Sequence, residues 1–285
     1  MTATNEINLG QPDLLFMIIK MLCVRTAVMF VLIFCGCKTK SLDSSQNVQQ
    51  LSEPNHPPRS EEEIFVRNNS DFAVSLYKLL HSKSSNLVFS PFSITTALAW
   101  QSLGTQGETL NEIREALRFT QKEELLHSVL KSIKNNILEE AKNSNVDFNV
   151  ANSLWLQLEL SVKKSFITAG RDFYDADLIF TDFAKNPTET YKQINSWIDD
   201  KTKGKIPNFL SPQDINPQMV FVLVNAIYFN GKWEKPFKTN KTKSTPFCVP
   251  DKGTLEVPTM ISDLMHVQYA QTEDAYYVEL PYKDK

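Results

Sequence analysis

The side chains that most often perform catalysis or bind metals are widely separated in this sequence. The four histidines are His56, His81, His127 and His266. None of them belongs to a His-Glu-x-x-His pattern, so the sequence predicts no metal site. The paired carboxylates Glu139-Glu140 and Asp199-Asp200 lie beside lysines in helical segments. This setting favours solvated helix surfaces over general acid–base catalysis.

Other signatures of an active site are also missing from the sequence. There is no Gly-x-Ser-x-Gly pattern and no phosphate-binding glycine loop, and the chain has only eight glycines. With 33 acidic and 30 basic residues, the net charge of −3 provides no general attraction to nucleic acid. We therefore expect no enzyme, no cofactor and no nucleic-acid partner.

The most informative polar residue is Asn225, the one interruption of an apolar run from Val220 to Phe229. The run is short, rich in β-branched and aromatic residues and closed by Asn230-Gly231, which predicts a buried strand covered on both faces. A buried amide without partners costs about 1–3 kcal/mol. Polar side chains from elsewhere should therefore meet Asn225, and the alternative is that it faces a loop or a bound water.

Hydrophobic spacing predicts the elements around this strand. Helices are expected over 61–82, 93–103, a short segment near Leu110–Leu117, 122–142, 165–174 and from Pro187 to Gly204; strands are expected over 86–90, 146–156, 176–183, 245–249, 254–260, 266–270 and 276–282. Ser90 and Ser93 frame one helix start, which predicts N-capping for both, and Thr109 with Glu112 forms a capping-box pattern at another. The strand over 276–282 is expected to pair with the strand over 266–270 across the turn at residues 271–274. Helices precede mixed elements and then strands, so the fold class is α+β.

The N-terminal part of the chain has a different composition. With 42% hydrophobic residues among 285, the chain can bury a large core, and we place its globular domain at residues 61–285. Residues 14–37 are apolar except for Lys20 and Arg25, which predicts a secretory signal within residues 1–37, or an uncleaved signal-anchor. A translation start at Met17 or Met21 would give the signal an ordinary length. Residues 38–60 are polar and proline-rich, as in a flexible linker.

Cysteines and sequons agree with this division. Three of the four cysteines, Cys23, Cys35 and Cys37, lie in the first segment. The globular part contains only Cys248 and therefore has no disulfide framework. We expect Cys248 to be packed and unreactive. Asn68-Asn-Ser and Asn240-Lys-Thr are N-glycosylation sequons, and they are compatible with an extracellular protein. Membrane attachment is expected only if residues 14–37 remain uncleaved.

Four short motifs follow one another in the globular part. They are Asn86-Leu-Val-Phe-Ser-Pro-Phe-Ser with Ser102-Leu-Gly-Thr, Ile194-Asn-Ser-Trp-Ile leading into Thr202-Lys-Gly-Lys-Ile, Leu223-Val-Asn-Ala-Ile-Tyr-Phe-Asn-Gly-Lys-Trp, and Glu279-Leu-Pro-Tyr. In content and order they resemble the serpin family, and the resemblance extends from Glu61 to the last residue. Asn230, where the family usually has lysine, and Ile261, where it often has methionine, depart from the pattern.

The resemblance implies helices packed around large mixed β-sheets. It also implies an exposed reactive loop that a target serine or cysteine protease cuts, after which the loop inserts as a strand and distorts the acyl-enzyme. By resemblance, Asn225 meets Ser90 and Ser93 in the shutter beneath this sheet, and Trp233 lies in the breach where the loop enters.

In the family, the reactive bond lies beyond the segment that ends in Leu280-Pro-Tyr. We therefore expect the reactive bond and the last strands outside these residues, which would form a partial domain that does not inhibit by itself. Two alternatives stay open, a non-inhibitory serpin with a carrier, chaperone or storage role and a short product without inhibitory function. The hinge ahead of the reactive loop would separate inhibitory from non-inhibitory members.

Overall fold

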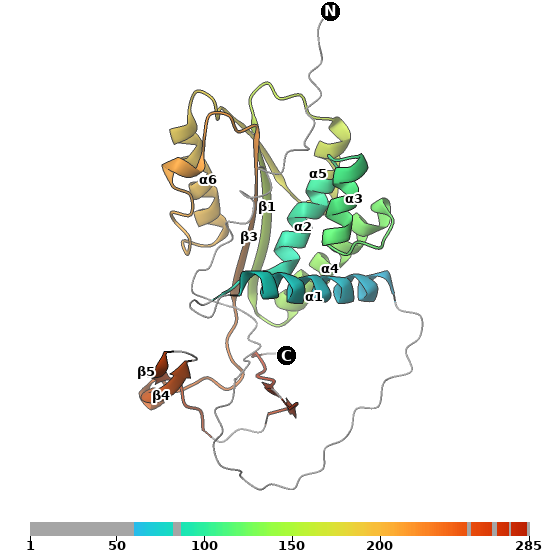
Figure 1. The fold of residues 1–285 in the computed structure, drawn as a ribbon. Helices are drawn as coiled ribbons and strands as arrows, with labels where there is room; N and C mark the ends of the chain where they lie inside the picture. The colour runs from blue at the N-terminus through green and yellow to red at the C-terminus, as the bar shows by residue number, and fades with distance from the viewer. Residues whose placement is uncertain (1–59, 82–86, 250–251, 264–266, 274, 284–285) are drawn as a thin grey trace, which may run out of the picture. The chain divides into compact units, whose positions relative to one another are not determined.

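The computed structural model describes residues 60–81, 87–249, 252–263, 267–273 and 275–283 (Figure 1). The predicted signal within residues 1–37 and the predicted linker up to residue 59 lie outside this part. The described chain forms two compact units, one containing residues 60–139 and 148–228 and the other containing 140–147 and the residues from 229 onward. Within the described residues, we find no helix with the length and apolar character needed to cross a membrane.

The helices lie close to where hydrophobic spacing predicts them. They are α1 (Glu61–Leu80), α2 (Pro91–Ser102), α3 (Gly107–Ala116), α4 (Glu123–Asn143), α5 (Lys164–Tyr174) and α6 (Pro187–Lys201). Ser60 and Glu63 form a reciprocal capping box at the start of α1. Ser90 caps α2, because its hydroxyl accepts a hydrogen bond from the Ser93 amide at 3.3 Å. The predicted N-capping is therefore confirmed for Ser90, whereas Ser93 lies within the helix and does not cap it.

The strands form three separate sheets in the described residues. They are β1 (Asp147–Gln157), β2 (Asp177–Thr181), β3 (Phe221–Asn230), β4 (Lys243–Val249), β5 (Gly253–Thr259), β6 (Tyr269–Gln271) and β7 (Tyr276–Val278). The first sheet has the order β2-β1-β3, with β1 and β2 parallel. The hairpins β4–β5 and β6–β7 are antiparallel. The second hairpin confirms the predicted pairing across the turn at residues 271–274.

Alternate side chains of the first sheet enter two different cores. Leu154, Leu156 and Leu223 contact the apolar cluster built by α1 to α5. Trp155, with Val222 and Val224, contacts a second cluster that includes Ile194 and Ile198 of α6. Figure 1 shows α6 on one side of β1 and β3 and α2, α3 and α5 on the other. Both faces of β3 are therefore covered, as its apolar sequence predicts.

Three local expectations are wrong. A strand was expected over 86–90, but residues 87–90 join no sheet among the described residues. The reason is that Pro91 begins α2 immediately after them. Helix α3 begins at Gly107, so Thr109 lies inside the helix and forms no capping box. Cys248 is exposed on the β4–β5 hairpin and is not packed.

Candidate functional site

The two serines predicted for the shutter lie together at the start of α2. The Ser93 hydroxyl donates to the Ser90 hydroxyl at 3.0 Å, and Ser93 is almost completely buried, with 2% of its surface exposed. Pro91, at the first helical position, needs no hydrogen-bond acceptor for its nitrogen and suits this turn. The pair is therefore a partly buried helix cap in which the two hydroxyls bond to each other.

Asn225 is partly buried and has a polar partner from a distant part of the sequence. Its Nδ2 donates to Oδ1 of Asn152 at 2.8 Å. Asn152 lies in β1, is 3% exposed, and donates from its own Nδ2 to the carbonyl of Tyr174 at 2.9 Å. Two amide side chains therefore join β3 to β1 and β1 to the last residue of α5.

The structure assigns Asn225 a different partner from the pair that the family resemblance implies. Across the described residues, no hydrogen bond joins Asn225 to Ser90 or Ser93. Asn152 could have been found in the sequence, because it occupies one row of the alternating pattern that also contains Val150 and Leu154. A polar residue in an inward-facing row is the same anomaly that drew attention to Asn225.

The polar contacts continue from Tyr174 into the helical layer. Its hydroxyl lies 2.5 Å from Nδ1 of His127, and Nε2 of His127 lies 3.4 Å from Oε1 of Glu123. Arg114 of α3 forms an ion pair with the other oxygen of Glu123 at 2.9 Å. Burial lowers the pKa of His127 against the opposing effect of Glu123, and burial raises the pKa of Tyr174 well above its ordinary value.

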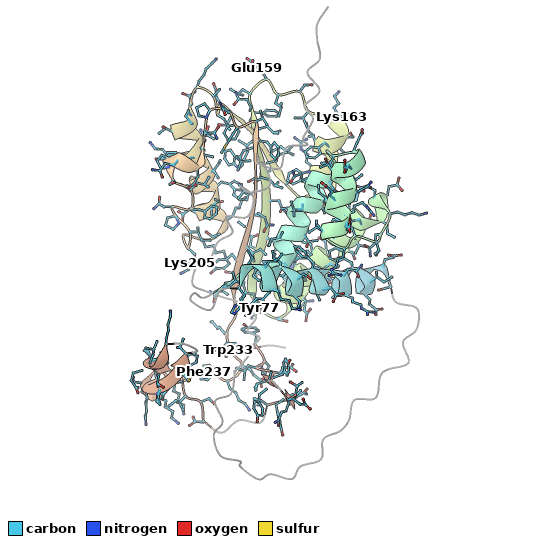
Figure 2. The ribbon with its side chains drawn as sticks, in the orientation of Figure 1. Tyr77, Glu159, Lys163, Lys205, Trp233 and Phe237 are labelled. Atoms are coloured by element: carbon cyan, nitrogen blue, oxygen red, sulfur yellow. The ribbon has the colours of Figure 1, made fainter. Side chains whose placement is uncertain are left out.

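Trp233, predicted for the breach, lies in the second unit with Phe237 (Figure 2). Its ring stacks on that of Tyr282 with centroids 4.6 Å apart and an interplanar angle of 7°. Backbone hydrogen bonds join Glu234 to the Pro281 carbonyl at 3.0 Å and Lys283 to the Lys232 carbonyl at 2.7 Å. The contact therefore brings together the third sequence motif, which ends at Trp233, and the fourth, Glu279-Leu-Pro-Tyr.

Gly231 makes this approach of the two motifs possible. A Cβ atom at Gly231 would lie 2.8 Å from Cδ1 of Tyr282 and 3.1 Å from Cζ of Phe229. Real Cβ atoms essentially never come within 3.0 Å of another residue's heavy atom. Any larger residue at 231 would therefore displace one of the two rings.

The two sequons lie in different environments. Asn68 is inside α1, and its Nδ2 donates to the carbonyl of Arg118 at 3.0 Å and to the Thr120 hydroxyl at 3.1 Å. Asn240 is exposed in the single turn of 3-10 helix Thr239–Lys241. The nitrogen to which a glycan would be attached is thus already engaged at Asn68, whereas Asn240 lies at the surface.

Metal-binding side chains do not converge within the described residues. No group of three or more histidine, cysteine, aspartate or glutamate side chains there could hold a metal ion. The predicted site residues lie instead in three contacts, namely the hydroxyl pair at α2, the amides between β1 and β3, and the Trp233–Tyr282 stack.

Comparison with known proteins identifies the family. A family model described as "Serpin (serine protease inhibitor)" matches residues 67–285, which is more than half of the chain. The chain belongs to the serpin family. The four motifs therefore indicated the family correctly, and helices packed with mixed sheets are the fold that it shares with serpins.

Curated relatives of this serpin include named inhibitors. Alpha-1-antitrypsin 1-1 of Mus musculus is 33% identical over 245 residues, which are 84% of this chain and 58% of the relative. The leukocyte elastase inhibitor of Bos taurus is 34% identical over 220 residues, or 76% of this chain and 57% of the relative. The chain thus spans somewhat more than half the length of these relatives.

A solved structure agrees with the fold. The native stressed conformation of Arabidopsis AtSerpin1 is matched with a TM-score of 0.69 at 26% identity. The match covers 80% of this chain and 59% of that structure.

Proposed function

We propose that, in its complete form, this serpin is a suicide-substrate inhibitor of a serine or cysteine endopeptidase. The protease nucleophile attacks the reactive-loop carbonyl and releases the amine of the cut bond, and loop insertion then distorts the acyl-enzyme before water can hydrolyse it. The observation that carries the proposal is the family match over residues 67–285. The names of the two relatives, an antitrypsin and an elastase inhibitor, support it.

The proposal assigns a role to the first sheet. β3 has β1 on one side and no further strand on the other among the described residues. An unpaired strand edge can accept an additional strand through its backbone N–H and C=O groups. We propose that loop insertion widens this sheet, that Ser90, Ser93 and Asn225 control its opening together with Asn152, and that Trp233 lies where the loop enters.

Incubation with proteases tests the inhibitory function. The protein isolated from its source is expected to form a complex with its target serine or cysteine protease that survives denaturing electrophoresis, because an ester or thioester links the two chains. The chain spans only 57–58% of the two inhibitors named above, and we expect the 285-residue chain alone to form no such complex. Cleavage without complex formation across a broad panel would instead favour a carrier, chaperone or storage role.

We propose further that the protein is secreted and carries a glycan at Asn240 and none at Asn68. Glycosylation of Asn68 would disturb two hydrogen bonds that tie α1 to residues 118–120. When the protein is secreted from eukaryotic cells, glycosidase treatment is therefore expected to lower its mass, and Asn240→Gln should abolish the shift. The matched change Asn68→Gln should leave the shift intact, and an unglycosylated protein confined to the cytosol would refute both proposals.

A further inference from the structure

A chain of polar contacts, buried at its centre and partly exposed at its ends, crosses the first unit from α3 to β3. It runs from Arg114 through Glu123, His127 and Tyr174 to Asn152, and from there to Asn225. We propose that His127 and Tyr174 form a proton-sensitive connection, in which protonation of His127 weakens the hold of α5 on the amide pair between β1 and β3. The connection would add regulation to the sheet opening proposed above.

The surroundings of His127 leave it few partners. It is 2% exposed, and within its own helix α4 it contacts Glu123. Helix α5 contributes Tyr174 and the ring of Phe173, whose centroid is 5.8 Å away. Helices α3 and α2 approach His127 through Glu123, which forms an ion pair with Arg114 and whose Oε1 lies 3.5 Å from the Ser102 hydroxyl.

A second charged pair lies next to this chain of contacts. Lys134 of α4 pairs with Asp175, the residue after Tyr174 at the end of α5. This ion pair also joins α4 to the end of α5, but neither side chain contacts the imidazole. Besides burial, the groups that affect the protonation of His127 are therefore Glu123 and Arg114, and Tyr174 is its hydrogen-bond partner.

The partners of neutral His127 define its tautomer. A carboxylate only accepts hydrogen bonds, so Nε2, which faces Glu123, carries the ring proton. Nδ1 is then an acceptor, and the Tyr174 hydroxyl donates to it. Burial raises the pKa of Tyr174, so its hydroxyl keeps its proton and remains a donor. Every polar atom of this neutral arrangement has a partner.

Protonation reverses the central bond. Imidazolium is a donor at both nitrogens, so the Tyr174 hydroxyl must turn and accept. Its own hydrogen would then need another acceptor among the stacked rings that surround it, including Trp100, whose centroid lies 5.7 Å away. A buried donor without an acceptor is costly. Because the Tyr174 carbonyl holds Asn152, a shift of Tyr174 is transmitted to Asn225.

The direction of the pH effect follows from the burial of the imidazole. The pKa of folded His127 lies below its ordinary value, so the unfolded chain binds the proton more tightly. The contribution of His127 to stability is therefore complete above a pH of about 6.5, the ordinary histidine pKa. It is lost as the pH falls through the lower pKa of the folded state. Mild acid should loosen the amide pair.

Two measurements on the 285-residue chain test the connection. In nitrogen-15 spectra at pH 7.5, His127 should show a neutral ring protonated at Nε2, and it should titrate below the ordinary pKa. On acidification, hydrogen exchange of the β3 amides should accelerate beyond the intrinsic effect of pH. The expected acceleration is about tenfold for each unit by which the pKa of His127 in the folded protein lies below its pKa in the unfolded chain. An Nδ1-protonated ring, or an ordinary titration, would overturn the proposal.

Matched variants separate a titrating connection from a purely structural one. His127→Asn keeps an acceptor near Nδ1 without a charge change in this range, so it should remove the extra acid acceleration. His81→Asn, at the exposed end of α1, should retain it. Glu123→Gln should move the transition to lower pH, because Glu123 favours the imidazolium. An unchanged profile in His127→Asn would refute the connection, and if that variant does not fold, the Glu123→Gln shift decides.

This test requires no protease. Failure of the proton-sensitive connection and failure of the proposed inhibition are therefore separate results.

Discussion

Replacing Gly170 with alanine is expected to destabilise the protein, although alanine favours helices over glycine by about 1 kcal/mol. A Cβ atom at position 170 in α5 would lie 2.5 Å from Cζ2 and 2.9 Å from Cε2 of Trp100. The Trp100 ring cannot easily move, because it is 1% exposed and stacks on both Phe166 and Tyr174. Overpacking of this kind typically costs about 1–3 kcal/mol.

Denaturant unfolding of the two proteins measures this effect. We expect Gly170→Ala to lower the free energy of unfolding, whereas Thr168→Ala, at an exposed position of the same helix, should change it by less than about 0.5 kcal/mol. If Gly170→Ala were as stable as the parent protein, the close packing of α5 on α2 would be refuted. This packing matters for the site, because it fixes the position of Tyr174.

The second large effect is expected at Asn152. Asn152→Ala removes the acceptor of the Asn225 amide and the donor to the Tyr174 carbonyl. Each polar group that is left unpaired costs about 1–3 kcal/mol, so the two groups together predict a total loss of about 2–6 kcal/mol. Thermal or denaturant unfolding measures this loss.

Asn149 provides a matched control in the same strand. It is only partly buried and makes one hydrogen bond, from Nδ2 to the Lys201 carbonyl at 3.1 Å. Asn149→Ala should therefore cost about 1 kcal/mol. Equal losses at positions 149 and 152 would mean that the bonds of Asn152 do not hold β1 as the structure indicates.

Local sequence patterns predicted the strand at Asn225 and most helices, because burial and periodicity are properties of neighbouring residues. The partner of Asn225 could not be predicted in the same way. Asn152 and Asn225 are separated by 73 positions, and only the register between β1 and β3 brings them together. The resemblance to serpins indicated the family but pointed to Ser90 and Ser93 as the partners.

The other differences have one local cause and two tertiary ones. The start of α3 depends on Gly107, whose φ is +63°, and not on the capping pattern at Thr109. The need for glycine at position 170 depends on how α2 crosses α5, which no pattern within either helix specifies. His127 belongs to a chain of polar contacts because other helices pack against α4 around it, although its sequence surroundings resemble an ordinary surface helix.

The amide pair Asn152–Asn225 is the contact on which the proposed control of sheet opening depends, and a double-mutant cycle measures it directly. If the two side chains bond to each other, Asn152→Ala and Asn225→Ala should be non-additive, with a coupling energy of about 1 kcal/mol or more. The contrary result is that the two free-energy changes are additive within about 0.5 kcal/mol and that Asn225→Ala is instead coupled to Ser90→Ala. In that case the partner of Asn225 would be the serine pair, and the chain of polar contacts would be refuted.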